Sequence, residues 1–302
     1  MIGIIGSGNV GANTAFFLAE KGVDHVLLYD IRDGTAQGKA LDMMEAAPIR
    51  GYRTTITGCD KPDDVLDCEI IIITAGAVRK PGMERDELFQ ENRKVIEEYA
   101  VKITNPHAKV IIVSEPVDLL TTLFVQKSPL PRPQIMGLGC VLDATRLRYM
   151  IAKELGVSME NVATQVVGRH TDEMVILKEY CCVSGVPIEN FMGPEVISDL
   201  FAKTRNAGSL IVELAGRAGA YYGPSAVVVE LVDAICRDTG RILSVSQMLS
   251  GQYGIEDVAL SLPSFINRNG ISRGVEPRLN SGDVEVLKSS AKGIAQILKE
   301  AQ

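Results

Sequence analysis

The sequence predicts an α/β protein with an N-terminal, doubly wound parallel sheet and a C-terminal α+β domain. Short apolar strands alternate with helical segments through the first half of the 302 residues. Such alternation is typical of parallel sheets whose crossovers are right-handed. A glycine-rich turn joins the first strand to the first helix, and the second half places long helices before its last strands. We expect the domains to span 1–140 and 141–302.

Composition restricts the classes of partner. The chain is 46% hydrophobic and 23% charged, as in ordinary soluble globular proteins, and its net charge is −7. Because it lacks a basic cluster, we expect no nucleic-acid partner, although a few buried arginines could still bind an anionic small molecule. No apolar run approaches the roughly 18–20 residues of a membrane span, and no signal peptide is recognisable. We therefore expect no membrane partner and a cytoplasmic location.

The six cysteines form no C-x-x-C pair. In a cytoplasmic chain of this length such cysteines are expected to be reduced and mostly buried. The sequence therefore predicts no metal site.

The first 30 residues carry a Rossmann dinucleotide-binding fingerprint. Residues 2–5 are expected to form a buried strand, 12–21 a helix, and 25–29 a second strand that ends at Asp30. The glycine-rich turn lets the backbone approach a pyrophosphate, and free N–H groups at the helix start hold its phosphates. Asp30 can accept from both ribose hydroxyls and would repel a 2′-phosphate, which favours NAD, although nearby Arg32 could tolerate that phosphate. The turn consists of Gly6, Ser7, Gly8, Asn9, Val10 and Gly11.

Continued alternation places a loop over this nucleotide site. The expected elements are a helix at 37–47, strands at 54–57 and 69–74, a helix at 86–103 and a strand at 109–114. Ligands of open α/β sheets bind beyond the carboxyl ends of the strands. The segment with Gly76, Arg79 and Arg85 should therefore lie over the cofactor. Val113 and Glu115, at the end of the strand 109–114, should lie at the same edge. We expect both to bind the cofactor, and Glu115 to contact the substrate as well.

The second half contains a candidate histidine for proton transfer. The expected elements are a helix from about 143 to 155, strands within 163–183, helices at 193–222 and 226–238, strands at 243–249 and 258–266, and a helix at 283–299. His170 follows a β-branched run and a glycine turn, where an imidazole could transfer protons near neutral pH. A surface or core histidine is the alternative. Asp143 and Arg146 share one helix face because they are three residues apart.

Taken together, these motifs resemble the lactate/malate dehydrogenase family, and most closely its lactate-dehydrogenase-like malate dehydrogenase branch. The resemblance covers nearly the whole chain in order. It implies NAD as cofactor, malate or oxaloacetate as substrate, reversible hydride transfer, and a homodimer or homotetramer. The segments that carry it are 6–11, Asp30, 75–76, 79–85, Asn92, 142–146, 168–172 and 251–254.

The resemblance also implies a role for each group, and elementary chemistry agrees with it. His170 as imidazolium can protonate the developing alkoxide, and Asp143 can accept from its other ring nitrogen and fix the tautomer. Arg146 can bind the C1 carboxylate through its planar fork, and Arg85 can bind the substrate and polarise its carbonyl. Asn92 lies near the cofactor in the family pattern, although an exposed helix position would also explain it.

Two positions depart from the family pattern. Glu115 stands where the family has Asn, whose amide reaches the substrate and the nicotinamide region. An ionised Glu can only accept, so it should repel a dicarboxylate unless it is protonated or turned away. It could weaken activity, shift substrate choice, or be an engineered change. Thr171 replaces the usual Gly after the histidine, so this turn must lie in an allowed backbone region or present His170 differently.

Three alternatives remain open at this point. A lactate or broader 2-hydroxy-acid dehydrogenase would differ only in substrate. An NAD- and metal-dependent glycosidase shares this fold and would need a metal on Cys140 and His170. A non-catalytic NAD-binding protein is the third, with Glu115 as its only hint. The helices at 37–47 and 205–222 have apolar faces that either a partner subunit or internal packing could cover.

Arg79 is expected to select the substrate. Lactate dehydrogenases that resemble this chain carry Gln at the matching position, whereas a cation suits the second carboxylate of oxaloacetate. We predict that Arg79→Gln lowers kcat/KM for oxaloacetate relative to pyruvate by on the order of a hundredfold, because a buried charge pair is broken. Steady-state kinetics with both oxo acids measure this ratio, and an unchanged ratio refutes the assignment.

Overall fold

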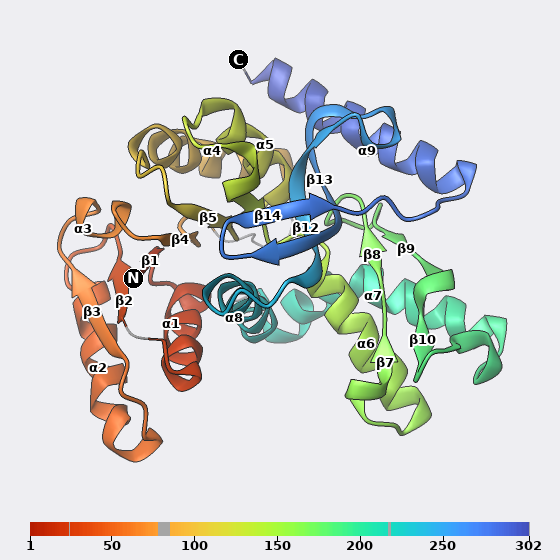
Figure 1. Cartoon of the computed structure of the whole chain (residues 1–302), viewed down its shortest axis with the longest axis horizontal. Helices are drawn as coiled ribbons and strands as arrows, with labels where there is room; N and C mark the ends of the chain where they lie inside the picture. Colours follow the sequence, from red (N-terminus) through yellow and green to blue (C-terminus); the bar gives the residue numbers. More distant parts are fainter. Residues whose placement is uncertain (24, 78–84, 217–218, 302) are drawn as a thin grey trace.

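The computed structural model describes residues 1–23, 25–77, 85–216 and 219–301. Within these ranges a sheet of nine strands forms the centre of the molecule, and helices cover both of its faces (Figure 1). From one edge to the other the strands are β14 (Gly270–Gly274), β13 (Glu256–Asn267), β12 (Arg241–Ser250), β6 (Ile135–Gly137), β5 (Lys109–Ile112), β4 (Ile70–Ile73), β1 (Ile2–Ile5), β2 (His25–Tyr29) and β3 (Thr55–Cys59). The helices are α1 (Asn9–Lys21), α2 (Thr35–Arg50), α3 (Asp63–Leu66), α4 (Arg85–Lys102), α5 (Val117–Lys127), α6 (Val141–Leu155), α7 (Pro194–Ala215), α8 (Tyr222–Cys236) and α9 (Ser281–Glu300).

The strands β3, β2, β1, β4, β5 and β6 pair in parallel, which confirms the predicted doubly wound sheet. Both faces of these strands are covered, so β4 can consist of four buried isoleucines. The strand order reverses between β1 and β4, and the crevice beyond their carboxyl ends is where such sheets bind ligands. Figure 1 shows α1, α2 and α8 on one side of the sheet and α4, α5 and α9 on the other.

The C-terminal strands extend this sheet instead of forming a separate one. β12, β13 and β14 are antiparallel, and β12 joins β6 through the pair Ser246 and Gly137. Strands were expected near β12 and β13, but β6, β14 and α5 were not anticipated. In α5 every residue from Val117 to Val125 is buried, so the helix lacks the polar face by which an amphipathic helix is recognised.

The prediction of one helix over 193–222 is wrong at its C-terminal end. α7 ends at Ala215, because Gly216 adopts a left-handed conformation with φ of 68° and its N–H closes the last turn on Val212. α8 then begins at Tyr222, before the expected residue 226. No helix in the described part of the chain is long and apolar enough to span a membrane.

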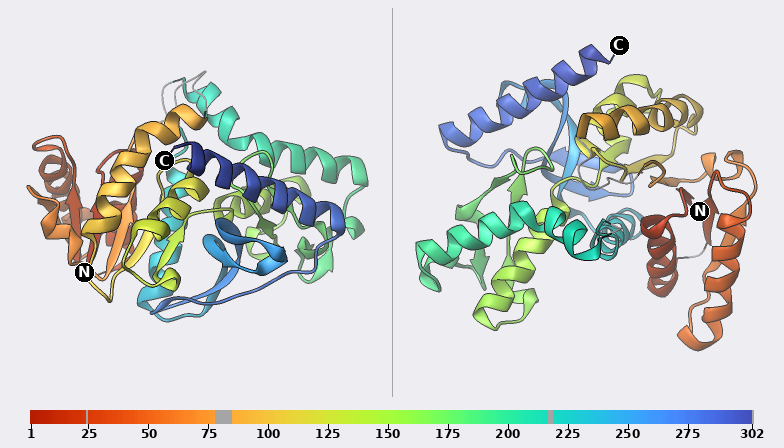
Figure 2. Two further views of the ribbon diagram at one scale, coloured as in Figure 1. Left: turned by 90° about the horizontal axis from the view of Figure 1, so that it is seen from above. Right: turned by 180° about the vertical axis from the view of Figure 1, so that it is seen from behind.

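A second core lies under α6 and α7, at the opposite end of the molecule from α2 (Figure 2). Its buried residues include Leu147, Ile151, Val166 and Leu200. Two small sheets cover it, one of β7 (Val162–Ala163), β10 (Cys182–Val183) and β11 (Val186–Pro187), the other of β8 (Val166–Val167) and β9 (Val175–Ile176). The β8–β9 hairpin carries His170 in its turn and is tied to β13 by two 2.8 Å hydrogen bonds between Gly168 and Ser261.

Candidate active site

The turn between β1 and α1 requires glycine for steric reasons. Gly6 has φ of 95°, and a Cβ on Gly11 would lie 1.9 Å from the carbonyl oxygen of Gly6. Close packing of α1 against β1 therefore depends on the missing side chain. Gly8, the N-cap residue of α1, has no side chain that could cap the helix, so the first N–H groups are available to a phosphate.

Asp30 follows β2 and is held as a carboxylate. The backbone N–H and the hydroxyl of Ser7 donate to its Oδ2 at 2.9 and 3.0 Å, and the backbone N–H and Nε of Arg32 donate to its Oδ1 at 3.1 and 3.0 Å. Burial raises the pKa of Asp30, but the hydrogen bonds from Arg32 and Ser7 outweigh it and lower the pKa to about 2. This charge opposes a 2′-phosphate. Lys39 donates to the carbonyl of Ser7 at 2.6 Å and stiffens the same turn.

A cavity of about 630 Å³ lies beyond the carboxyl ends of β1, β2 and β4. Its volume is in the range of small-molecule and cofactor sites. Of the residues predicted to bind the cofactor, Gly6, Gly8, Asn9, Val10, Asp30 and Gly76 line it. Sequence reasoning missed other lining residues, among them Tyr99 of α4 and Tyr221 before α8, because neither carries a local signal.

Val113 is predicted to bind the cofactor but is buried at the end of β5, where its N–H donates to the carbonyl of Ile73 at 2.9 Å. It thus supports the edge of the sheet beside β4.

Asn92 connects the nucleotide cavity to the second half of the site. Its side chain is buried, so the alternative of an exposed helix position is wrong. Oδ1 accepts from the N–H of Ala77 at 2.6 Å, and Nδ2 donates to the carbonyl of Glu115 at 2.7 Å. The amide thereby joins the segment that follows β4 to the segment that follows β5.

His170 is fixed at both its ring and its backbone. Asp143, in the first turn of α6 and fully buried, lies 2.5 Å from Nδ1 through its Oδ2. The backbone N–H of His170 donates to Oδ2 of Asp118 at 2.7 Å, and Ser246 donates to the other oxygen of Asp118 at 2.6 Å. Asp118 was not anticipated from the sequence. Asp118, in α5, holds the turn that carries His170, and Ser246 of β12 holds Asp118.

The charges around the ring favour the imidazolium. Burial alone would lower the pKa of His170, but Asp143 and Glu115 raise it to about 9 against the opposing effect of Arg146. Arg146 lies 3.3 Å from Asp143 on the same face of α6, as predicted. Burial raises the pKa of Asp118 to about 6 despite its hydrogen bonds.

Glu115 comes within 3.4 Å of His170, measured from Oε1 to Nε2. The structure thus brings together His170, Asp143, Arg146 and Glu115. Arg79 lies outside the described residues, as does the side chain of Arg85. Thr171 does not adopt a positive φ, so the turn lies in an allowed backbone region as required.

Cys140 does not support a metal-dependent site. Its thiol donates to the carbonyl of Gly168 at 3.6 Å, and burial raises its pKa well above the usual range. A protonated, buried thiol is a poor metal ligand. Among the described side chains, no three of His, Cys, Asp or Glu are grouped to hold a metal ion.

Comparison with known proteins places this chain and its fold in one class. The model of the NAD binding domain of lactate/malate dehydrogenase matches residues 1–137, and that of the α/β C-terminal domain matches residues 140–302. The chain therefore belongs to the lactate/malate dehydrogenase family, as the sequence motifs indicated, and NAD is the cofactor of this family.

Individual relatives agree with this assignment. A malate dehydrogenase from Desulforudis audaxviator is 37% identical over 300 residues, which is 99% of this chain and 97% of the relative. The crystal structure of Cryptosporidium parvum malate dehydrogenase matches with a TM-score of 0.95 at 31% identity, over 99% of this chain and 98% of the other. A lactate dehydrogenase of the same organism, complexed with lactic acid and the dinucleotide, has a TM-score of 0.94 at 30% identity, over 99% and 96%.

The glycine turn gives a direct test of the cofactor site. We predict that Gly11→Ala weakens NADH binding at least about tenfold and costs about 1–3 kcal/mol of stability, because the new Cβ meets backbone that cannot move freely. Fluorescence titration with NADH and thermal unfolding measure both effects. Gly38→Ala in α2 is the matched control, since a Cβ there meets nothing within 4 Å. Equal NADH affinity in the two variants would contradict the assignment.

The His170 pKa also predicts how stability depends on pH. The folded protein keeps this proton up to about pH 9, whereas the ordinary value is 6.5, so the stabilisation is complete below pH 6.5 and is lost as pH rises through about 9. The free energy of unfolding should fall by up to about 1.4 kcal/mol per pH unit in this window. Urea unfolding of wild type and His170→Gln measures the difference, and parallel pH curves would disprove the ion pair.

Proposed function

We propose that this chain is an NAD-dependent malate dehydrogenase that transfers a hydride reversibly between NAD(H) and malate or oxaloacetate. One observation carries the proposal. The ring of His170 is held by Asp143, beside the guanidinium of Arg146, and Asn92 links this group to the dinucleotide cavity. These contacts support our assignment of a proton donor, a carboxylate anchor and a cofactor site to one edge of the sheet.

The residues present fit NAD. The turn from Gly6 to Gly11 has no room for a Cβ at either end, and the ionised Asp30 suits ribose hydroxyls and opposes a 2′-phosphate. When bound, the nicotinamide supplies or accepts the hydride. We assign cofactor binding to Gly6, Ser7, Gly8, Asn9, Val10, Gly11, Asp30, Gly76, Asn92, Val113 and Glu115.

The proton steps follow from the geometry of the ring. In the reductive direction His170 gives its Nε2 proton to the C2 oxygen of the substrate as negative charge develops on that oxygen. In the oxidative direction the neutral ring takes this proton back. Asp143 accepts from Nδ1 throughout, which fixes the ring orientation and stabilises the imidazolium. Arg146 binds the C1 carboxylate through its guanidinium plane.

The substrate class rests on two further arginines. We assign Arg79 to the second carboxylate of the diacid and Arg85 to the carbonyl oxygen, where negative charge develops. Malate dehydrogenases among the relatives support this assignment, and the lactate dehydrogenases of the same fold keep the lactate or broader 2-hydroxy-acid alternative in play.

We further propose a domain division after Cys140, a homodimer or homotetramer, and a cytoplasmic enzyme of the tricarboxylic acid cycle. The start of α6 directly after Cys140 supports the division. Exposed apolar side chains on α2 and α7 support contact with a partner subunit. They are Leu41, Ile49, Leu210 and Leu214.

Steady-state kinetics with NADH and NADPH against oxaloacetate and pyruvate test the proposal. We expect kcat/KM to be highest for NADH with oxaloacetate, and at least about a hundredfold lower for either pyruvate or NADPH, because each exchange leaves a charge unpaired or opposed. Higher activity on pyruvate would instead identify a lactate dehydrogenase. NADH binding without turnover of either oxo acid would identify a non-catalytic protein.

A further inference from the structure

The ring of His170 lies between two carboxylates, and only one of them belongs to the proton relay. Nδ1 is occupied by Asp143. Nε2 is therefore the atom that must meet the reacting oxygen of the substrate, and in this structure Oε1 of Glu115 lies 3.4 Å from it. Glu115 thus contacts the same ring atom that the proposed reaction uses.

Glu115 is held in this place at its backbone and at its second carboxylate oxygen. Its carbonyl accepts from Nδ2 of Asn92 at 2.7 Å, and its Oε2 accepts from the N–H of Val117 at 3.0 Å in the first turn of α5. A carboxylate at a helix N-terminus is stabilised by the helix dipole. The side chain is nevertheless 45% exposed, so it can turn into solvent without a change in the backbone.

We propose that Glu115 is a specificity-determining residue that competes with the substrate for His170. In the free enzyme its carboxylate occupies Nε2, and a 2-oxo acid binds productively only by displacing it. This inference rests on the proposed function, because it assigns Nε2 to the substrate oxygen. No covalent bond forms or breaks in the exchange. The C2 oxygen of the substrate replaces the carboxylate oxygen of Glu115 beside Nε2 of the imidazolium.

Glu115 opposes the binding of a substrate in two ways, and only the second depends on the charge of the substrate. Displacement of Glu115 from His170 costs every 2-oxo acid the same. Repulsion from the displaced carboxylate grows with the charge of the substrate, because Asn92 holds the backbone carbonyl of Glu115 and so keeps this residue beside the site. Glu115 should therefore disfavour the dianion oxaloacetate more than the monoanion pyruvate.

The other charged groups around the ring determine whether the pKa of His170 rises or falls when the charge of Glu115 is removed. Asp143 and Arg146 face it from α6, and Asp118 of α5 accepts from its backbone N–H. Removing the charge of Glu115 leaves Asp143 as the carboxylate partner of the ring, still opposed by Arg146. His170 must then lose its proton at lower pH than in the wild type.

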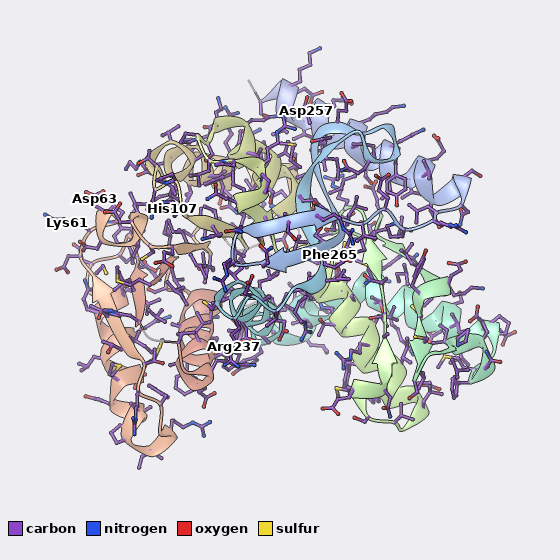
Figure 3. The ribbon with its side chains drawn as sticks, viewed as in Figure 1. Lys61, Asp63, His107, Arg237, Asp257 and Phe265 are labelled. Carbon is purple, nitrogen blue, oxygen red and sulfur yellow. The ribbon has the colours of Figure 1, made fainter. Side chains whose placement is uncertain are left out.

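Imidazole NMR titration of the free enzyme tests the contact without any turnover. The chain has only three histidines, so the signals can be assigned by substitution. We expect Glu115→Gln to lower the pKa of His170 by about one unit. His25, bonded to Thr57, and His107, which lies just before β5 (Figure 3), serve as internal references.

Glu189→Gln is the matched control for this titration. Glu189 pairs with Lys178 at 3.2 Å, and its side chain is 43% exposed. The Glu189→Gln variant therefore loses a comparable ion pair at a different place in the protein. It should leave His170 unchanged. If Glu115→Gln also leaves His170 unchanged, the proposal is overturned. Should that variant not fold, Glu115→Asp replaces it: the shorter side chain withdraws the charge from Nε2 and should lower the pKa by a smaller amount.

Kinetics provide the second readout. In Glu115→Gln we expect KM for oxaloacetate to fall about tenfold, since a ground-state competitor has been removed. KM for pyruvate should fall less. An unchanged or higher KM for oxaloacetate overturns the proposal. If the wild type turns over neither oxo acid, the proposed function fails, while the NMR titration still decides whether Glu115 occupies His170.

Discussion

The contact between His170 and Asp143 is the interaction on which the rest of the site depends. Asp143 is fully buried at the start of α6, and a carboxylate in such a place needs a charged or hydrogen-bonded partner. The imidazole provides that partner at 2.5 Å. In return the ring is oriented, and its proton is retained to higher pH than in an ordinary histidine. The same hydrogen bond therefore stabilises the buried carboxylate of Asp143 in α6 and orients the imidazole of His170 for the proposed proton transfer.

The nine-stranded sheet explains how this contact is maintained. The parallel strands present their carboxyl ends at one edge, where Asn92 joins the segments after β4 and β5. The antiparallel strands hold the turn that carries His170 from the other side. Ser246 of β12 bonds Asp118, and Ser261 of β13 bonds Gly168. Because β12 and β13 continue the same sheet, the position of His170 is tied to the position of the nucleotide cavity.

The protein binds anions although its net charge is −7. Local groups, not the net charge, decide this, because burial concentrates the field of a few cations and helix N-termini. In the proposed function, Arg146 and the start of α1 act in this way at the two ends of the site. Glu115 and Asp30 are the opposing charges, and in the proposal each excludes a ligand group: Asp30 a phosphate on the ribose, and Glu115 a carboxylate beside His170.

Much of the site was determined by the sequence alone, because local constraints demanded particular residues. The spacing of Gly6 and Gly11, and Asp30 after the second strand, predicted the dinucleotide turn, and regular alternation predicted the parallel sheet. The face shared by Asp143 and Arg146 followed from helix geometry. The family resemblance, not any local pattern, paired Asp143 with His170.

Only the tertiary structure decided the remaining contacts. α5 was missed because it is buried on every side and shows no periodicity. The link from Asp118 to Ser246, and the approach of Glu115 to His170, join residues whose proximity depends on the order of strands in the sheet. Local sequence records which face of an element is buried, but not which distant element covers it. The second carboxylate at the imidazole therefore became visible only in the fold.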